Sequence, residues 1–144
     1  MLSVSVNTDQ KAPCIFLEGR LDANTCEQFD DTLQPILEKE TWLIIDLSKC
    51  FYISSSGIRS LLKATKILKA KEGALFFSSI SPTAFQVIEM AGLHQIFELF
   101  DTLNDALKEV HIRKRTPLAN GLLDIEGHTI QLQLYPEKIE PTLL

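Results

Sequence analysis

A strand-like run from Trp42 to Leu47, apolar except for Asp46 and followed by the serine-rich turn Ser54-Ser55-Ser56-Gly57, constrains this chain more than any other feature. An apolar strand without polar alternation is typical of a central strand that is covered on both faces of a parallel sheet. After the turn, apolar residues recur at helical spacing from Ile58 to Leu68. The segment therefore predicts a buried strand, a turn and an amphipathic helix, which together are the building unit of an α/β fold.

Strand and helix patterns alternate along the rest of the chain. The expected strands lie at residues 2–6, 14–17, 42–47, 74–77 and 96–99, and the expected helices begin near residues 24, 55, 82 and 103. The first two strands should form a hairpin, and Pro35 should kink or end the first helix. Repeated strand–helix units indicate an α/β fold with a mixed, mostly parallel sheet flanked by about four helices.

The serine cluster has two interpretations on local grounds. Serine is a preferred N-cap residue, and a serine before an apolar helix commonly satisfies free backbone N–H groups. A helix start also favours added negative charge, so the fold would tolerate a phosphate on one of these serines. A hydrolase nucleophile is not supported, because a nucleophile elbow has a glycine on both sides of the serine and only Gly57 is present. We predict no catalytic residue here.

Composition disfavours several other classes of function. A formal net charge of −5 and a pI near 5.2 argue against a general nucleic-acid-binding protein. No stretch reaches the roughly 18 apolar residues that suggest a membrane span, so we expect a cytoplasmic protein without membrane insertion. The three cysteines and three histidines lack the spacing of a metal site, and no glycine-rich phosphate loop is present. We therefore expect neither a metal nor a cofactor.

Several short motifs occur in an order that resembles the STAS domain of bacterial anti-sigma-factor antagonists. The matching segments are Gly19-Arg20-Leu21-Asp22, Asp46-Leu47-Ser48, Ser54-Ser55-Ser56-Gly57-Ile58, Gly73-Ala74-Leu75-Phe76-Phe77, Ser81-Pro82-Thr83, Met90-Ala91-Gly92-Leu93 and Ile96-Phe97. The resemblance covers residues 1 to 110 or so and implies the STAS fold. We accordingly expect a STAS domain at residues 1–112 and a separate extension at residues 113–144.

The resemblance implies a non-enzymatic partner switch. The unmodified antagonist binds an anti-sigma factor, which is a serine kinase of histidine-kinase-like ATPase fold, and phosphorylation breaks the complex. A PP2C-type phosphatase is the partner that would reverse the modification. The acceptor lies two residues before the glycine, at Ser55, and Ser54 stands where the family usually has Asp. The residues expected to bind the partner are Asp22, Ser54, Ser56, Gly57, Arg59, Lys63 and Lys66.

Two of these assignments keep a second interpretation. Arg59, Lys63 and Lys66 recur on the helical face opposite the apolar stripe, which indicates either a solvated face or a docking surface beside the serines. Asp22 either caps the helix that begins near residue 24 or contacts the partner. Asp46 should end its strand and hold the following loop, and the loops that carry these acids and Ser55 should converge at the carboxyl edge of the sheet.

The segment after residue 112 falls outside the resemblance. Ile130, Leu132 and Leu134 alternate with glutamines, and Glu126-Gly127 could form a turn before them, so the extension predicts a β-hairpin. Its apolar face must cover either this domain or a second copy of the chain, which would give a homodimer. An alternative function for the whole chain is that of a STAS accessory subunit of a membrane transport or lipid-trafficking complex, which would not be phosphorylated.

Overall fold

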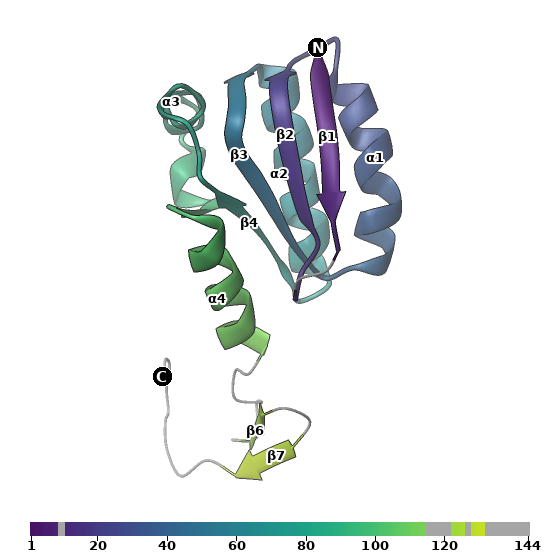
Figure 1. The fold of residues 1–144 in the computed structure, drawn as a ribbon, viewed down its shortest axis with the longest axis vertical. Coiled ribbons are helices and arrows are strands. Elements are labelled where there is room, and N and C mark those ends of the chain that lie inside the picture. Colours follow the sequence, from purple (N-terminus) through teal and green to yellow (C-terminus); the bar gives the residue numbers. More distant parts are fainter. Residues whose placement is uncertain (9–10, 115–121, 126–127, 132–144) are drawn as a thin grey trace. The chain divides into compact units, whose positions relative to one another are not determined.

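The computed structural model describes residues 1–8, 11–114, 122–125 and 128–131 (Figure 1). Strands and helices alternate along this part of the chain, as predicted. In chain order the elements are β1 (Leu2–Asn7), β2 (Cys14–Leu21), α1 (Cys26–Lys39), β3 (Trp42–Ile53), α2 (Ser55–Ala70), β4 (Ala74–Ser78), α3 (Pro82–Met90), the short 3-10 helix η1 (Leu93–Gln95), β5 (Glu98–Phe100), α4 (Leu103–Lys114), β6 (Leu122–Ile125) and β7 (His128–Gln131).

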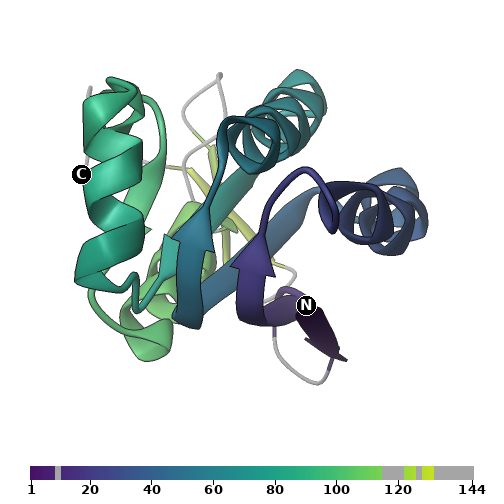
Figure 2. The ribbon, with the colours of Figure 1, turned by 90° about the horizontal axis from the view of Figure 1, so that it is seen from above.

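Five of the strands form one sheet in the order β1-β2-β3-β4-β5. β1 and β2 pair antiparallel, which confirms the predicted amino-terminal hairpin, and the three other neighbouring pairs are parallel. Helices α1 and α2 pack against each other on one face of the sheet (Figures 1 and 2). Because β2 leads into α1 and β3 leads into α2, both helices begin at the carboxyl edge of these two strands.

The core lies where the helices meet the sheet. Alternate residues of β3, namely Leu43, Ile45 and Leu47, belong to the same buried cluster as the apolar stripes of α1 and α2. The opposite face of the sheet is also buried at β4, where the Phe76 ring packs against the Phe100 ring at a centroid distance of 4.8 Å. Burial on both faces explains why the central strands read as apolar runs.

Strand β3 is longer than the sequence predicted and has an irregular register. Its pairing with β4 ends at Asp46, opposite Ser78, but it continues beside β2 until Ile53 lies opposite Leu21. The register against β2 shifts twice along this extension, and each shift adds a residue to β3 as a β-bulge does. The strand was expected to end near Asp46 and to be followed by a loop, but β3 continues to Ile53, immediately before the serine cluster.

In helix α1, packing against the core outweighs the helix-breaking tendency of a proline. Pro35 was expected to kink or end this helix, but the helix continues to Lys39. Proline removes one backbone hydrogen bond and costs about 3 kcal/mol or more in a helix interior. Buried residues on both sides of it, Phe29, Leu33 and Leu37, attach the helix to the core. Their burial offsets the cost, since each such side chain contributes about 1.5 to 3 kcal/mol.

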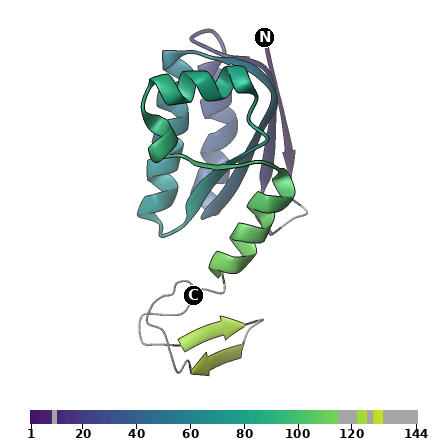
Figure 3. The same ribbon diagram turned by 90° about the vertical axis from the view of Figure 1, so that its left-hand side faces the viewer.

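The chain divides into two compact units, Met1–Lys108 and Glu109–Leu144. In the second unit β6 and β7 pair antiparallel, with Leu122 opposite Gln131, which confirms a hairpin in the extension (Figure 3). The expected turn at residues 126–127, together with Leu132 and Leu134, lies outside the described residues. The homodimer through this extension stays a prediction. Among the residues with a described structure, no helix has the length and apolar character needed to cross a membrane.

Candidate functional site

The serine cluster lies at the junction of β3 and α2, at the carboxyl edge of the sheet. The Ser54 N–H donates a 2.9 Å hydrogen bond to the carbonyl oxygen of Leu21, the last residue of β2. Ser54 is also the N-cap of α2, since its Oγ accepts a 3.2 Å hydrogen bond from the Gly57 N–H. The capping interpretation is therefore correct for the first of the three serines.

The three serines have different environments. The Ser54 side chain is half-buried and occupied by capping, and the Ser56 Oγ accepts a 3.2 Å hydrogen bond from Nη2 of Arg59. Ser55 is exposed at the first helical position, and its hydroxyl makes no hydrogen bond to any part of the chain that the structure describes. The hydroxyl of Ser55 is thus the one in this cluster that a modifying enzyme could reach without disturbing an existing contact.

Gly57 allows the first turn of α2 to lie directly against β2. A Cβ atom at this position would be 2.6 Å from the carbonyl oxygen of Leu21 and 2.9 Å from the Cγ atom of the same residue. The first of these contacts is with backbone, which cannot rotate away. A glycine is therefore required for this close approach, and the approach fixes where the serines sit relative to the end of β2.

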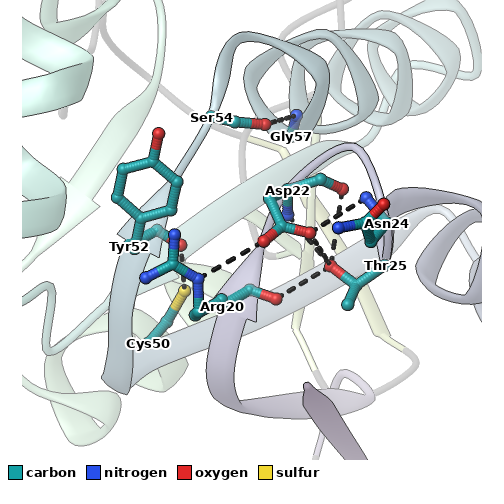
Figure 4. Close-up of polar contacts among 8 residues, drawn as sticks. All are labelled: Arg20, Asp22, Asn24, Thr25, Cys50, Tyr52, Ser54 and Gly57. Atoms are coloured by element: carbon teal, nitrogen blue, oxygen red, sulfur yellow. Dashed lines mark hydrogen bonds and ion pairs between the residues drawn. The ribbon is translucent and has the colours of Figure 1, made fainter.

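The loop after β2 holds Asp22 in a network of short contacts (Figure 4). The Asp22 N–H donates to Oγ1 of Thr25 at 2.9 Å, and the Asn24 N–H donates to Oδ1 of Asp22 at 3.0 Å. Desolvation raises the pKa of the Asp22 carboxyl, but hydrogen bonds from Asn24, Arg20 and Thr25 together outweigh it and hold the pKa below its ordinary value. The carboxylate stabilises the turn before α1, whose N-cap is Thr25.

Arg20 and Tyr52 also lie at the carboxyl edge of the sheet. The sequence predicted no functional role for either residue. They lie opposite each other in the parallel register of β2 and β3, and the guanidinium carbon of Arg20 is 4.3 Å from the centre of the Tyr52 ring. The same guanidinium pairs with Asp22, with Nε 3.3 Å from Oδ2 (Figure 4). Arg20 was part of the recognised motif, but its contact with Tyr52 depends on the shifted strand register.

Comparison with protein families decides what kind of domain this is. The family model for the STAS domain matches residues 3–106, which is most of the chain. The chain belongs to the STAS domain family. The resemblance inferred from the short motifs is therefore confirmed, and so is the STAS fold.

Several relatives of this STAS protein are named as anti-sigma factor antagonists. The anti-sigma-B factor antagonist of Listeria monocytogenes is 30% identical over 86 residues, which are 59% of this chain and 75% of the relative. The crystal structure of an anti-sigma factor antagonist from Mycobacterium paratuberculosis has a TM-score of 0.71 at 24% identity, over 77% of this chain and 95% of that one. The Bacillus protein SpoIIAA in its phosphorylated form has a TM-score of 0.59 at 22% identity, over 76% and 99%. These two structures share the fold.

The basic face of the STAS domain lies on α2. Arg59, Lys63 and Lys66 are exposed, whereas the buried stripe of the helix faces the core. The first turn of α2 contains no acidic residue. The three basic side chains thus form a positively charged surface, which we call the basic face, that begins within one turn of Ser55.

Asp46 does not join the other predicted residues. It lies inside β3 and is buried, with 6% of its surface exposed, so the expectation that it ends the strand at the serine site was wrong. Its Oδ1 accepts hydrogen bonds from the N–H and hydroxyl of Ser48 at 3.0 and 2.6 Å, and its Oδ2 accepts one from Ser78 at 3.2 Å. Asp46 therefore ties β3 to β4 at the place where the two strands part.

The arrangement suits binding and modification. Asp22, Ser54, Ser55, Ser56 and Gly57 come together at the carboxyl edge of β2 and β3, and the basic face extends from them along α2. Within the described ranges there is no group of three or more His, Cys, Asp or Glu side chains that could hold a metal ion.

Proposed function

We propose that this STAS protein is a non-enzymatic, cytoplasmic anti-sigma-factor antagonist whose binding to its anti-sigma factor is switched off by phosphorylation of Ser55. The observation that carries the proposal is the difference among the three serines. Ser55 is exposed and its hydroxyl is not engaged within the described structure, whereas Ser54 caps α2 and Ser56 accepts a hydrogen bond from Arg59. The named relatives support the binding function, and the free hydroxyl supports the choice of acceptor.

The expected partner is an anti-sigma factor that is also a serine kinase of histidine-kinase-like ATPase fold. In the transfer step the Ser55 Oγ would form a bond to the γ-phosphorus of ATP, ADP would leave, and the hydroxyl proton would pass to the kinase or to water. A PP2C-type phosphatase would hydrolyse the phosphate and restore the binding form. The chain supplies the acceptor hydroxyl and a docking surface, and the partner supplies the nucleotide.

The charge around Ser55 explains how one phosphate could end binding. The basic face of Arg59, Lys63 and Lys66 is suited to an acidic partner surface, because complementary charge steers association and fixes orientation. A phosphate carries a charge of about −1.5 to −2 at neutral pH. Placed within a turn of the basic face, it would cancel much of that face and repel an acidic partner. We propose that Asp22, Ser54 and Ser56 form the remainder of the docking surface. Gly57, which was also expected to bind the partner, is buried against β2 and positions the serines instead.

Ser54 in place of the usual Asp is compatible with this function. Serine and aspartate are both preferred N-cap residues, so the substitution keeps the hydrogen bond to the Gly57 N–H and removes only a negative charge. The unmodified form of this chain therefore has a more positive helix start than a relative with Asp would have. Phosphorylation adds the same charge of about −1.5 to −2 in either case, so here it acts on a helix start that carries no carboxylate beforehand.

Phosphosite mapping tests the proposal. The protein is incubated with ATP and candidate anti-sigma-factor serine kinases, and the modified residue is identified by mass spectrometry. We expect phosphate at Ser55, loss of labelling in Ser55→Ala, and retained labelling in Ser56→Ala as the matched control. Modification at Ser54 or Ser56 alone would show that the acceptor is misassigned. A stable complex with a permease or transport ATPase, without phosphorylation, would favour the accessory-subunit function instead.

A further inference from the structure

The guanidinium of Arg59 lies near the amino end of α2, where the helix dipole disfavours positive charge. Arg59 belongs to the second turn of α2, but its Nη2 lies 3.2 Å from the Oγ of Ser56, so its guanidinium reaches back over the first turn. Side chains on a helix point toward its amino end, which places a residue above the ones three and four positions before it. Arg59 therefore lies over the same turn as the proposed acceptor, Ser55.

The guanidinium of Arg59 has no carboxylate partner in the described part of the chain. Arg20 pairs with Asp22 at 3.3 Å, and Arg113 pairs with Glu109 at 2.8 Å, but no such ion pair is formed by Arg59. The first turn that it covers contains no acidic residue. Positive charge near a helix amino terminus is unfavourable because of the helix dipole. The unmodified protein thus holds an uncompensated positive charge beside Ser55.

We propose that Arg59 is the intramolecular receptor for the phosphate on Ser55, a role that rests on the proposed function. Residues four apart on a helix are neighbours, and a guanidinium binds two phosphate oxygens at once. On phosphorylation, Arg59 exchanges the Ser56 hydroxyl for the phosphate. The exchange withdraws Arg59 from the basic face, so the partner loses one of its cationic contacts in addition to meeting a new negative charge.

Other basic residues are less suited to this role. Arg20 already pairs with Asp22 and stacks on Tyr52, so it would have to give up both contacts to reach a phosphate. Lys63 lies on the same exposed face as Arg59 but eight positions beyond Ser55, which corresponds to about 12 Å along the helix axis. Lys63 therefore serves as a control of equal charge that cannot contact the phosphate while remaining in the helix.

The test uses full-length protein with phosphoserine incorporated at position 55 during translation, so it does not depend on the natural kinase. Phosphorus NMR follows the second ionisation of the phosphate, whose ordinary pKa is about 6. We expect the pKa to fall to about 5 in the otherwise natural chain, because a cation within contact distance favours the doubly charged form. Arg59→Ala should raise the pKa back toward about 6, with the helix start still favouring the doubly charged form, and Lys63→Ala should leave it near 5. Equal values in the first two proteins would overturn the proposal.

Partner binding separates this inference from the proposed function. If phosphorylation weakens binding of the anti-sigma factor by the same factor with and without Arg59, the withdrawal of Arg59 from the interface is wrong. A smaller factor in Arg59→Ala supports it. If phosphorylation leaves partner binding unchanged in the natural chain, the proposed function fails, whereas the NMR result still decides whether Arg59 binds the phosphate. Circular dichroism of each variant verifies that the fold is retained, as expected for an exposed side chain.

Discussion

Replacing Ser54 and Ser55 by alanine, one at a time, tests whether the two neighbours have separate roles. Ser54→Ala removes the hydrogen bond that its Oγ accepts from the Gly57 N–H at 3.2 Å. Loss of an N-cap side chain costs about 1 kcal/mol, within a range of about 0.5 to 2. Ser55→Ala removes an exposed hydroxyl that has no partner in the described structure. Its effect on the free energy of unfolding should stay within about 0.5 kcal/mol of zero.

Urea unfolding followed by far-ultraviolet circular dichroism measures this difference. With an m-value of about 1.5 kcal/mol/M, the loss of about 1 kcal/mol moves the midpoint of Ser54→Ala down by about 0.7 M. The m-value should not change, because the variant buries the same core. Thermal unfolding should show a matching decrease of about 4 °C for a folded unit of this size.

Ser54→Asp is the matched control, since aspartate is also a good N-cap and adds a favourable charge at the helix start. This variant should be as stable as the natural protein, or more stable by about 0.3 to 1 kcal/mol. The result that would refute the reasoning is an equal loss of stability in Ser54→Ala and Ser55→Ala. That outcome would mean that Ser55 is structural, and its proposed role as a freely accessible phosphate acceptor would lose its physical basis.

Gly57→Ala should lower the free energy of unfolding by about 1 to 3 kcal/mol, because the added Cβ would lie 2.6 Å from a backbone oxygen of β2, and a urea titration with no change in midpoint would contradict this. The double variant Lys63→Glu, Lys66→Glu should associate more slowly with the anti-sigma factor, and its association rate should depend less on salt. Stopped-flow rates equal to those of the natural protein at every salt concentration would show that the basic face is only solvated and does not dock the partner. Burial raises the pKa of the Cys14 and Cys50 thiols, so the folded state keeps them protonated where the unfolded state ionises. Their contribution to stability is complete below pH 8.5 or so and is lost as the pH rises further, and a variant with alanine at both positions should lose less stability between pH 8 and 10.

The sequence by itself determined the features that depend on neighbouring residues. The apolar run from Trp42, a capping role within the serine cluster and the stripe of α2 each follow from side-chain spacing and backbone hydrogen bonding within a few positions. The position of Ser55 at the carboxyl edge also followed, because parallel strands bring their carboxyl ends to the same side of a sheet. These signals are local, so the order of the residues is sufficient to read them.

Only the tertiary structure decided the features that depend on strand register and packing. The two register shifts between β2 and β3 place Arg20 against Tyr52, and no periodicity in the sequence indicates either shift. Asp46 is buried inside the sheet, where it accepts hydrogen bonds from Ser48 and Ser78. Helix α1 continues through Pro35 because side chains on both sides of it are buried in the core. The sequence likewise does not distinguish which of the three adjacent serines has a hydroxyl without a hydrogen bond. The freedom of the Ser55 hydroxyl depends on which neighbouring groups the fold brings within hydrogen-bonding distance of each serine, and that is a property of three-dimensional contacts.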